Sequence, residues 1–311
     1  GRRGGQLMAA NHITINDVGP RDGLQNQPKL LSKEQRLSLI SALVDAKVPE
    51  IEVGAFVSPK SVPAMAGTAK LFTALVAAPE NSTSLFSALI PNMKGFELAM
   101  SAQVPLMSLV VATSNTMNLK NIRMSTEDSV KVSKDVLKVA RQQGANVQAY
   151  VATAWACPFE GKISADSVFS ITDQLLQAGA SSVVIADTIG AANPSEVNQL
   201  MEAMASRFDI DQLSCHFHDT RAMGLANVYA AITAGIRKFD ASIAGLGGCP
   251  FAPGASGNVA TEDVVMMVEQ MGFSTGIDMA LLVKASDLAV ALTGTASGGN
   301  AKSWIENYYL N

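Results

Sequence analysis

The sequence predicts an α/β fold, a TIM (β/α)8 barrel with one short extra helix at its C-terminal end. Short β-branched runs alternate with longer amphipathic runs, and eight such units fit into 311 residues. Eight units in this length favour a closed barrel over an open doubly wound sheet. No linker or composition break divides the chain, so we expect residues 8–311 to form a single domain. Residues 1–7 resemble an artificial leader before a natural start at Met8.

The first half of the chain contains four predicted strands, at residues 13–18, 50–53, 85–89 and 106–112. Ser32 is expected to begin the helix after the first strand, because Gln35 stands three residues on and completes a capping box. Leu37, Ile40 and Val44 recur at helical spacing and form the predicted apolar stripe of that helix.

The second half contains four more predicted strands, at residues 147–153, 182–187, 213–218 and 239–244. Amphipathic patterns predict helices at residues 194–208 and 261–271. Residues 278–292 are expected to form the extra helix. The Gly/Ser/Thr-rich residues 293–299 are expected to form a mobile tail.

Composition narrows the class of protein. A net charge of -4 and a pI near 5.4 argue against a nucleic-acid partner. No apolar run approaches the ~20 residues that a membrane helix needs, and no secretory signal is visible. The cysteines number three, Cys157, Cys215 and Cys249, without a CxxC pair. This sparse set suits a reducing bacterial cytoplasm and makes a structural zinc site improbable.

Chemically active side chains stand at or just after the carboxyl ends of the predicted strands, where barrel enzymes hold their active sites. The residues are Arg21 and Asp22 after the first strand, Glu52 in the second, Asp187 closing the sixth, His216 and His218 on the seventh, and Cys249 and Asn258 after the eighth. Their convergence on one rim predicts an active site.

Two histidines suggest a metal ion. His216 and His218 are two residues apart on a strand, so they point to the same face. They could instead be ordinary hydrogen-bonded polar residues, but the chain has only three histidines. Asp22 and Asn258 would add oxygen ligands, which suit Mg²⁺ or Mn²⁺ better than a closed zinc site, with Zn²⁺ and Co²⁺ as alternatives.

Each of the remaining rim residues allows two interpretations, one structural and one functional. Arg21 either forms an ion pair with Asp22 or directs its guanidinium at a carbonyl or enolate oxygen. Cys249 lies in a glycine-rich loop and is either a small buried residue or a general acid or base. Glu52 and Asp187 either belong to structural networks or orient Arg21 and the histidines.

These residues lie in motifs that resemble the 3-hydroxy-3-methylglutaryl-CoA (HMG-CoA) lyase family, within the metal-dependent aldolase and Claisen-type barrel lyases. The matching segments are residues 18–26 (VGPRDGLQN), 56–60, 157–162, 187–190, 216–220 and 244–263. The resemblance implies a divalent cation on Asp22, His216, His218 and Asn258, with Arg21 as electrophile and Cys249 as the acid or base of a mobile loop.

The resemblance also implies the reaction. Family members cleave a 3-hydroxyacyl-CoA to acetyl-CoA and a keto acid, which is acetoacetate in the parent case. That chemistry belongs to leucine degradation and ketone-body formation, and it implies an acyl-CoA partner and a homodimer. The base that deprotonates the substrate hydroxyl would be His216 or a bound water.

Several positions depart from the family pattern and leave the acyl group open. Gln148 stands where family members carry an arginine that points into the barrel, and Trp155 is bulkier than the usual residue at its position. Arg221 stands where many members have a tyrosine. Gln27 and Pro28 stand where many members have a basic residue. The predicted substrate contacts are Arg21, Gln25, Gln148, Tyr150 and Trp155. Citramalyl-CoA is an alternative substrate. A Claisen-type synthase and a non-catalytic acyl-CoA binder are alternative functions.

Overall fold

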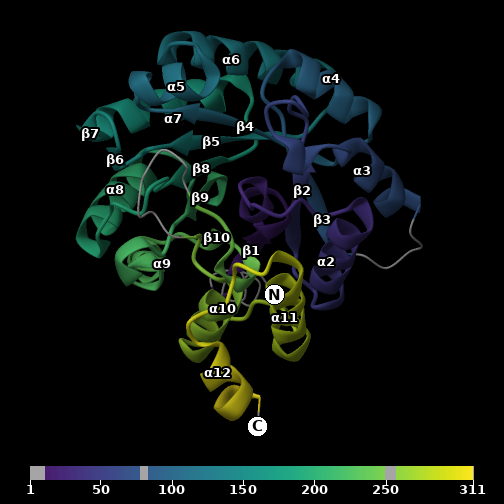
Figure 1. Ribbon diagram of the computed structural model, residues 1–311. Coiled ribbons are helices and arrows are strands. Elements are labelled where there is room, and N and C mark those ends of the chain that lie inside the picture. The colour runs from purple at the N-terminus through teal and green to yellow at the C-terminus, as the bar shows by residue number, and fades with distance from the viewer. Residues whose placement is uncertain (1–10, 78–82, 249–256, 311) are drawn as a thin grey trace, which may run out of the picture.

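The computed structural model describes residues 11–77, 83–248 and 257–310, and in this part eight parallel strands close into a barrel (Figure 1). The strands are β1 (Thr14–Asp17), β2 (Glu50–Ala55), β3 (Leu85–Leu89), β4 (Leu106–Ala112), β5 (Val147–Ala152), β8 (Val183–Ala186), β9 (Leu213–His216) and β10 (Lys238–Ala241). Each strand pairs with its neighbours in chain order, and β10 pairs with β1 to close the sheet. The predicted TIM barrel is confirmed. The expected leader and Cys249 lie outside the described residues.

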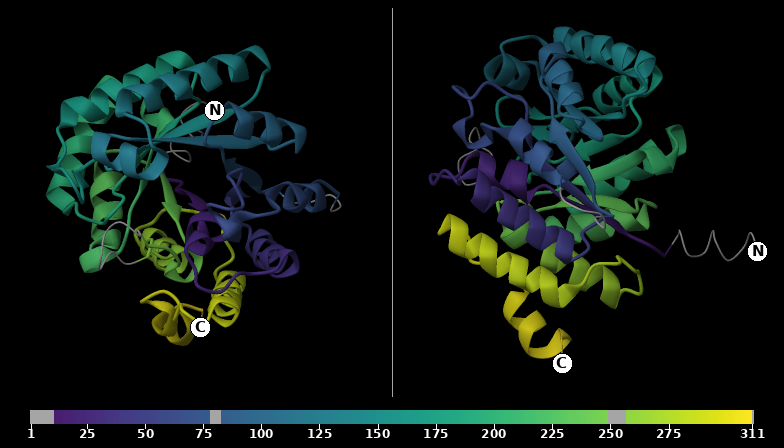
Figure 2. Two further views of the ribbon diagram at one scale, coloured as in Figure 1. Left: turned by 45° about the horizontal axis from the view of Figure 1, so that its top comes forward. Right: turned by 90° about the vertical axis from the view of Figure 1, so that its right-hand side faces the viewer.

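Helices surround the barrel on all sides (Figure 2). They are α2 (Lys33–Asp45), α3 (Thr68–Ala77), α4 (Met93–Ser101), α5 (Asn115–Ile122), α6 (Thr126–Gln142), α7 (Ala165–Ala178), α8 (Pro194–Arg207), α9 (Gly224–Thr233), α10 (Thr261–Gln270), α11 (Met279–Thr293) and α12 (Lys302–Trp304). The predicted capping box of α2 is present, because Ser32 and Gln35 each accept a hydrogen bond from the other's backbone N–H. No helix in the described ranges is long and apolar enough to cross a membrane.

The loops contain one short β-hairpin and several single turns of helix. A two-stranded hairpin, β6 (Ala156–Cys157) and β7 (Gly161–Lys162), follows β5 and was not predicted. Single turns of helix are η1 (Gly19–Gly23), η2 (Pro63–Met65), η3 (Ile210–Gln212), η4 (Thr220–Ala222), η5 (Ile243–Gly245) and η6 (Ile305–Tyr309). Two of them, η1 and η5, follow β1 and β10 and help to build the rim described below.

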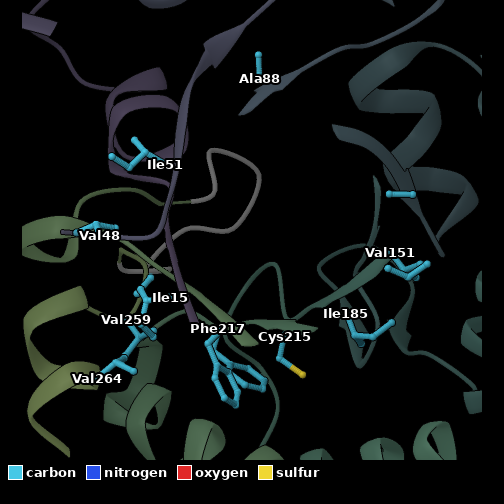
Figure 3. Close-up of a cluster of buried hydrophobic side chains, with 14 of the residues drawn as sticks. Ile15, Val48, Ile51, Ala88, Val151, Ile185, Cys215, Phe217, Val259 and Val264 are labelled. Carbon is cyan, nitrogen blue, oxygen red and sulfur yellow. The ribbon is translucent and has the colours of Figure 1, made fainter. Parts of the chain in front are cut away.

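The outer face of the barrel carries the hydrophobic core. Ile15, Ile51, Val151 and Ile185, one from each of four strands, are all fully buried in one cluster with the surrounding helices (Figure 3). Burial of such apolar side chains is the main stabilising contribution to a fold of this kind. The helices therefore pack on this face of the barrel mainly through apolar contacts, which leaves its inner face to other chemistry.

The inner face is largely polar. Asn16 on β1 donates through Nδ2 to Asp240 Oδ1 on the paired strand β10 at 2.9 Å. Gln148 Nε2 donates to Ser108 Oγ on the neighbouring strand at 3.0 Å. The Tyr150 hydroxyl reaches across the interior from β5 to Asp240 Oδ2 at 2.5 Å, although β8 and β9 separate these two strands in the sheet. A hydrogen-bonded network thus fills the barrel beneath the rim.

The segment predicted as a mobile tail, residues 293–299, is not a tail, because it leads from α11 to α12 and its end contacts α10. Two buried carboxylates at the start of α10 accept hydrogen bonds from its backbone. Glu262 accepts from Gly299 N at 3.1 Å, and Asp263 accepts from Asn300 N at 2.8 Å and Ala301 N at 3.0 Å. Gly299 ends the Gly/Ser/Thr-rich segment, and its backbone N–H, with those of Asn300 and Ala301, binds these carboxylates.

Asp263 makes the stability of this attachment depend on pH. Burial raises the pKa of Asp263 from 3.8 to about 6. The folded chain therefore keeps a proton that the unfolded chain releases, and the stability this contributes is lost as pH rises through about 6. We expect Asp263→Asn to gain stability relative to the parent chain between pH 4 and pH 7, by at most about 3 kcal/mol. Urea unfolding of both proteins at the two pH values checks this, and a pH-independent difference would contradict it.

Candidate active site

The rim begins where β1 ends. Asp17 Oδ1 accepts hydrogen bonds from Gly19 N at 2.8 Å and Ile243 N at 3.2 Å, so one buried carboxylate joins η1 to η5. Burial raises the pKa of Asp17 to about 7. Gly23 ends η1, and a Cβ there would stand 2.7 Å from Leu246 Cβ. This close approach of η1 to the segment after β10 fixes the position of the two charged residues that η1 carries, Arg21 and Asp22.

Three side chains converge as possible metal ligands. Asp22, His216 and His218 each offer one ligand atom, and these atoms lie within 4.8 Å of one another. Phe217, between the histidines, packs into the outer hydrophobic core (Figure 3). The alternation of a strand therefore turns both imidazoles to the opposite side, as predicted, with ring centroids 5.1 Å apart.

Asn258 completes the cluster. Its Nδ2 donates to Asp22 Oδ2 at 2.8 Å and to Leu246 O at 3.0 Å. Its Oδ1 is buried and has no hydrogen-bond partner among the described residues. An orphaned amide oxygen beside a carboxylate and two imidazoles is a donor set that suits a divalent cation. The residues predicted to bind the ion thus fit one, although they do not identify which.

The ionisation of Asp22 and His218 suits metal binding. Burial opposes the charged form of Asp22, but Arg21, His216 and His218 outweigh it and lower the pKa of Asp22 to about 2. Burial, assisted by His216, lowers the pKa of His218 to about 4. At neutral pH Asp22 is therefore a carboxylate and His218 a neutral imidazole, which are the forms that bind metal ions. Burial opposes the charged form of His216, but the hydrogen bond and charge of Asp240, with the charge of Asp22, outweigh it and raise the pKa of His216, so a metal ion must displace the proton from this ring.

Glu52 holds Arg21 at the cluster. Arg21 Nε donates to the fully buried Glu52 at 2.5 Å, and Nη1 donates to Gln25 Oε1 at 2.9 Å and Asp22 Oδ1 at 3.3 Å. Nη2 has no acceptor in the described part of the chain. Two of the three guanidinium nitrogens are thus engaged, and Nη2 remains available to a ligand.

Each metal-facing histidine has its own partner at Nδ1. His218 Nδ1 lies 3.0 Å from the backbone oxygen of Asp187, whose carboxylate instead accepts hydrogen bonds from its own loop at Ala191 and Ala192. His216 Nδ1 lies 2.9 Å from Asp240 Oδ2. Asp240 was missed from the sequence; the available signal was a charged residue inside the predicted eighth strand.

Three residues predicted to contact the substrate, Tyr150, Gln148 and Trp155, form hydrogen bonds with other residues of the protein. The Tyr150 hydroxyl bonds Asp240, as described above. Gln148 is hydrogen-bonded inside the barrel to Ser108 and Ser182. Trp155 is buried between β5 and α8, where its indole N–H donates to Glu196 O at 3.2 Å and its ring lies 5.8 Å from that of Phe217. Arg21 and Gln25 do lie at the cluster.

The position of Trp155 leads to a prediction. We expect Trp155→Phe to lower the melting temperature by a few degrees, because one buried hydrogen bond contributes roughly 1 kcal/mol, and to leave kcat/KM unchanged. Trp304→Phe is the matched control, since Trp304 is exposed on α12 and is the other tryptophan of the chain. Thermal melts and steady-state kinetics check this. A raised KM with an unchanged melting temperature would contradict this expectation and support the predicted substrate contact of Trp155.

A cavity of about 710 Å³ opens beside the cluster. It lies between the loop after η1, the glycine-rich segment after η5 and the segment after α11. Its lining includes Asn26, Gln27, Leu246, Asn258, Thr295 and Asn300. Asn258 belongs to both the cavity and the cluster, so a molecule in the cavity reaches the possible metal ligands.

A closed barrel that gathers an Arg–Asp–His–His–Asn set at its carboxyl rim is typical of an enzyme, and the set offers a possible site for a metal ion. Comparison with known proteins identifies the family. The HMGL-like family model matches residues 12–289, and the chain belongs to this family of carbon–carbon lyases.

Individual relatives cover almost the whole chain. Hydroxymethylglutaryl-CoA lyase of Pseudomonas mevalonii is 40% identical over 289 residues, which span 93% of this chain and 95% of that protein. (R)-citramalyl-CoA lyase of Chloroflexus aurantiacus is 40% identical over 91% of each chain. The crystal structure of hydroxymethylglutaryl-CoA lyase from Pseudomonas aeruginosa superposes with a TM-score of 0.90 at 38% identity, over 95% of this chain and 98% of that one.

Proposed function

We propose that this protein is a divalent-metal-dependent lyase that cleaves HMG-CoA to acetyl-CoA and acetoacetate. The observation that carries the proposal is the convergence of Asp22, His216 and His218 on one point beside Arg21. The similarity to the P. mevalonii lyase supports the choice of substrate. We propose Mg²⁺ or Mn²⁺ as the cation, because the set combines oxygen and imidazole donors and lacks thiolates among the described residues.

The reaction is a retro-Claisen cleavage. The substrate's tertiary hydroxyl loses its proton, the adjacent C–C bond breaks, and its electron pair moves into a thioester enolate. A cation held by Asp22, His216, His218 and Asn258 would lower the pKa of that hydroxyl. Arg21 would stabilise the enolate oxygen through the free Nη2, while Glu52 keeps the guanidinium in place.

Two proton transfers remain. We propose that the Cys249 thiol protonates the enolate carbon to give acetyl-CoA, an assignment that rests on the sequence because Cys249 lies outside the described residues. His216 is engaged by Asp240 at Nδ1 and faces Asp22 with Nε2 at 3.8 Å. This geometry favours a ligand role for His216, so we propose that a water molecule takes up the hydroxyl proton.

The cavity beside Asn258 supports an acyl-CoA substrate. Its volume of about 710 Å³ suits an extended chain, and its exposed backbone at the glycine-rich segment offers hydrogen bonds to amide groups. An HMG-CoA lyase structure from A. baumannii, with a TM-score of 0.91 at 38% identity over 97% of this chain and 98% of that one, is described as a complex with coenzyme A and 3-methylmalate. We propose that the pantetheine arm lies in this cavity.

Citramalyl-CoA is the second candidate substrate. The C. aurantiacus citramalyl-CoA lyase and the P. mevalonii HMG-CoA lyase are equally identical to this chain, at 40%. Both substrates carry a tertiary alcohol with a methyl group next to the bond that breaks. The two therefore use the same cluster and differ only in the carboxylate arm of the keto acid that is released.

Acetyl-CoA release from purified protein tests the proposal. HMG-CoA and citramalyl-CoA are assayed side by side with Mn²⁺, each with and without EDTA. EDTA-sensitive cleavage of HMG-CoA is the expected result. Cleavage of citramalyl-CoA alone would reassign the substrate and keep the mechanism, while cleavage of neither would contradict the proposed function.

We also propose that the protein acts as a homodimer in a bacterial cytoplasm. The family resemblance supports the dimer, and the buried free thiols of Cys157 and Cys215 suit a reducing compartment. Light scattering should give about twice the chain mass of 32.5 kDa, and a monomer would contradict the dimer.

A further inference from the structure

We propose that Asp240 is a positioning residue for His216: it fixes which ring nitrogen of His216 carries the proton and so directs the bare nitrogen at the ion. The inference rests on the metal site of the proposed function and deepens it. It also assigns a role to Tyr150, whose hydroxyl holds the Asp240 carboxylate in place.

The contacts of Asp240 define the tautomer of His216. A carboxylate only accepts hydrogen bonds, so the 2.9 Å contact between Asp240 Oδ2 and His216 Nδ1 requires the proton to sit on Nδ1. In the neutral ring Nε2 then carries a lone pair, and it faces Asp22 Oδ2 at 3.8 Å. That separation is too long for a hydrogen bond. A metal ion between these two atoms would interact favourably with both the carboxylate and the Nε2 lone pair.

Asp240 is itself held from two sides. Asn16 donates to its Oδ1 at 2.9 Å from β1, and the Tyr150 hydroxyl donates to its Oδ2 at 2.5 Å from β5. The residue is only 2% exposed, and within the described ranges its one ion-pair partner is His216. A buried carboxylate without a lysine or arginine partner is costly to the fold. The interaction of the Asp240 carboxylate with the His216 ring offsets this cost.

His218 provides the internal comparison. Its Nδ1 meets a neutral acceptor, the backbone oxygen of Asp187, at 3.0 Å. A carboxylate is a stronger acceptor than a carbonyl and makes the opposite ring nitrogen a better donor to metal. The two imidazoles are therefore unequal ligands, and His216 is the one whose strength depends on a side chain that mutation can change.

The first test reads the tautomer in metal-free protein. With three histidines in the chain, long-range ¹H–¹⁵N spectra resolve each ring. At a pH high enough to leave the His216 ring neutral, we expect the parent protein and Glu50→Gln to hold His216 as the Nδ1–H form, and Asp240→Asn to show a mixture of tautomers. Glu50 is the matched control because its carboxylate also lies in the barrel, paired with Lys238 at 2.8 Å. An unchanged Nδ1–H form in folded Asp240→Asn would overturn the inference.

The second test measures the affinity of the protein for Mn²⁺. Calorimetric Mn²⁺ titration should give a Kd weakened about 10- to 100-fold in Asp240→Asn, a smaller loss in Tyr150→Phe, and no change in Glu50→Gln. A purely structural Asp240 would lower the melting temperature and leave the Kd unchanged, which would overturn the inference. If the parent protein bound no Mn²⁺, the proposed metal site would fail, and the tautomer spectra would still decide the role of Asp240. Should Asp240→Asn not fold, Tyr150→Phe must weaken Mn²⁺ binding or the inference is wrong.

Discussion

Arg21→Gln is expected to lower kcat for acyl-CoA cleavage by roughly 10³-fold while Mn²⁺ affinity stays within a few-fold of the parent value. The Arg21 side chain places a positive charge beside the cluster, is fixed by a buried partner, Glu52, and keeps a free donor at Nη2. Glutamine keeps some length but loses the charge that balances an enolate. The ligand atoms of Asp22 and the histidines are untouched, so the ion should stay.

The control for this change is Arg207→Gln, at an exposed arginine on α8. It removes the same charge from the surface and should leave kcat unchanged. Steady-state kinetics and Mn²⁺ titration of the three proteins check the prediction. Near-parent turnover by Arg21→Gln would remove the electrophile from the mechanism.

Asp22→Ala is expected to abolish cleavage by a different route, with loss of the ion. Asp22 is the one carboxylate of the cluster, and its pKa of about 2 keeps it charged at all working pH values. Without it, two imidazoles and an amide remain, so we expect Mn²⁺ affinity to fall by at least roughly 100-fold. Activity should return in part at high Mn²⁺ concentration, which Arg21→Gln should not allow.

Asp45→Asn, at an exposed position at the end of α2, is the control for loss of one carboxylate. Metal titration followed by turnover measurements at rising Mn²⁺ separates the two mutants. If Asp22→Ala bound Mn²⁺ like the parent chain, the cluster would not be the metal site.

Much of the fold follows from local patterns. β3 and β4 have the predicted bounds, and Ser32 with Gln35 begins α2 as expected. The α2 stripe was only partly right: Ile40 is buried, but Leu39 and Leu43, in place of Leu37 and Val44, are its fully buried partners. The helix packs against both the barrel and α11. The sequence of α2 alone does not indicate the contact with α11.

The rim cluster was predictable for a topological reason. In a barrel of parallel strands every carboxyl end lies on the same rim, so residues far apart in sequence, such as Asp22 and His216, meet without any knowledge of side-chain contacts. The partners of these residues were not predictable in that way. Tyr150 and Asp240 face one another across the interior, and Trp155 turns outward to α8, as the pairing of strands and the packing of helices dictate.

The most direct test of the account is acetyl-CoA release from HMG-CoA by metal-stripped enzyme, measured before and after addition of Mn²⁺ or Mg²⁺. The cluster of Asp22, His216, His218 and Asn258 predicts no turnover in the stripped protein and recovery when the ion is added. Full turnover by enzyme that is free of metal by elemental assay would contradict the central claim.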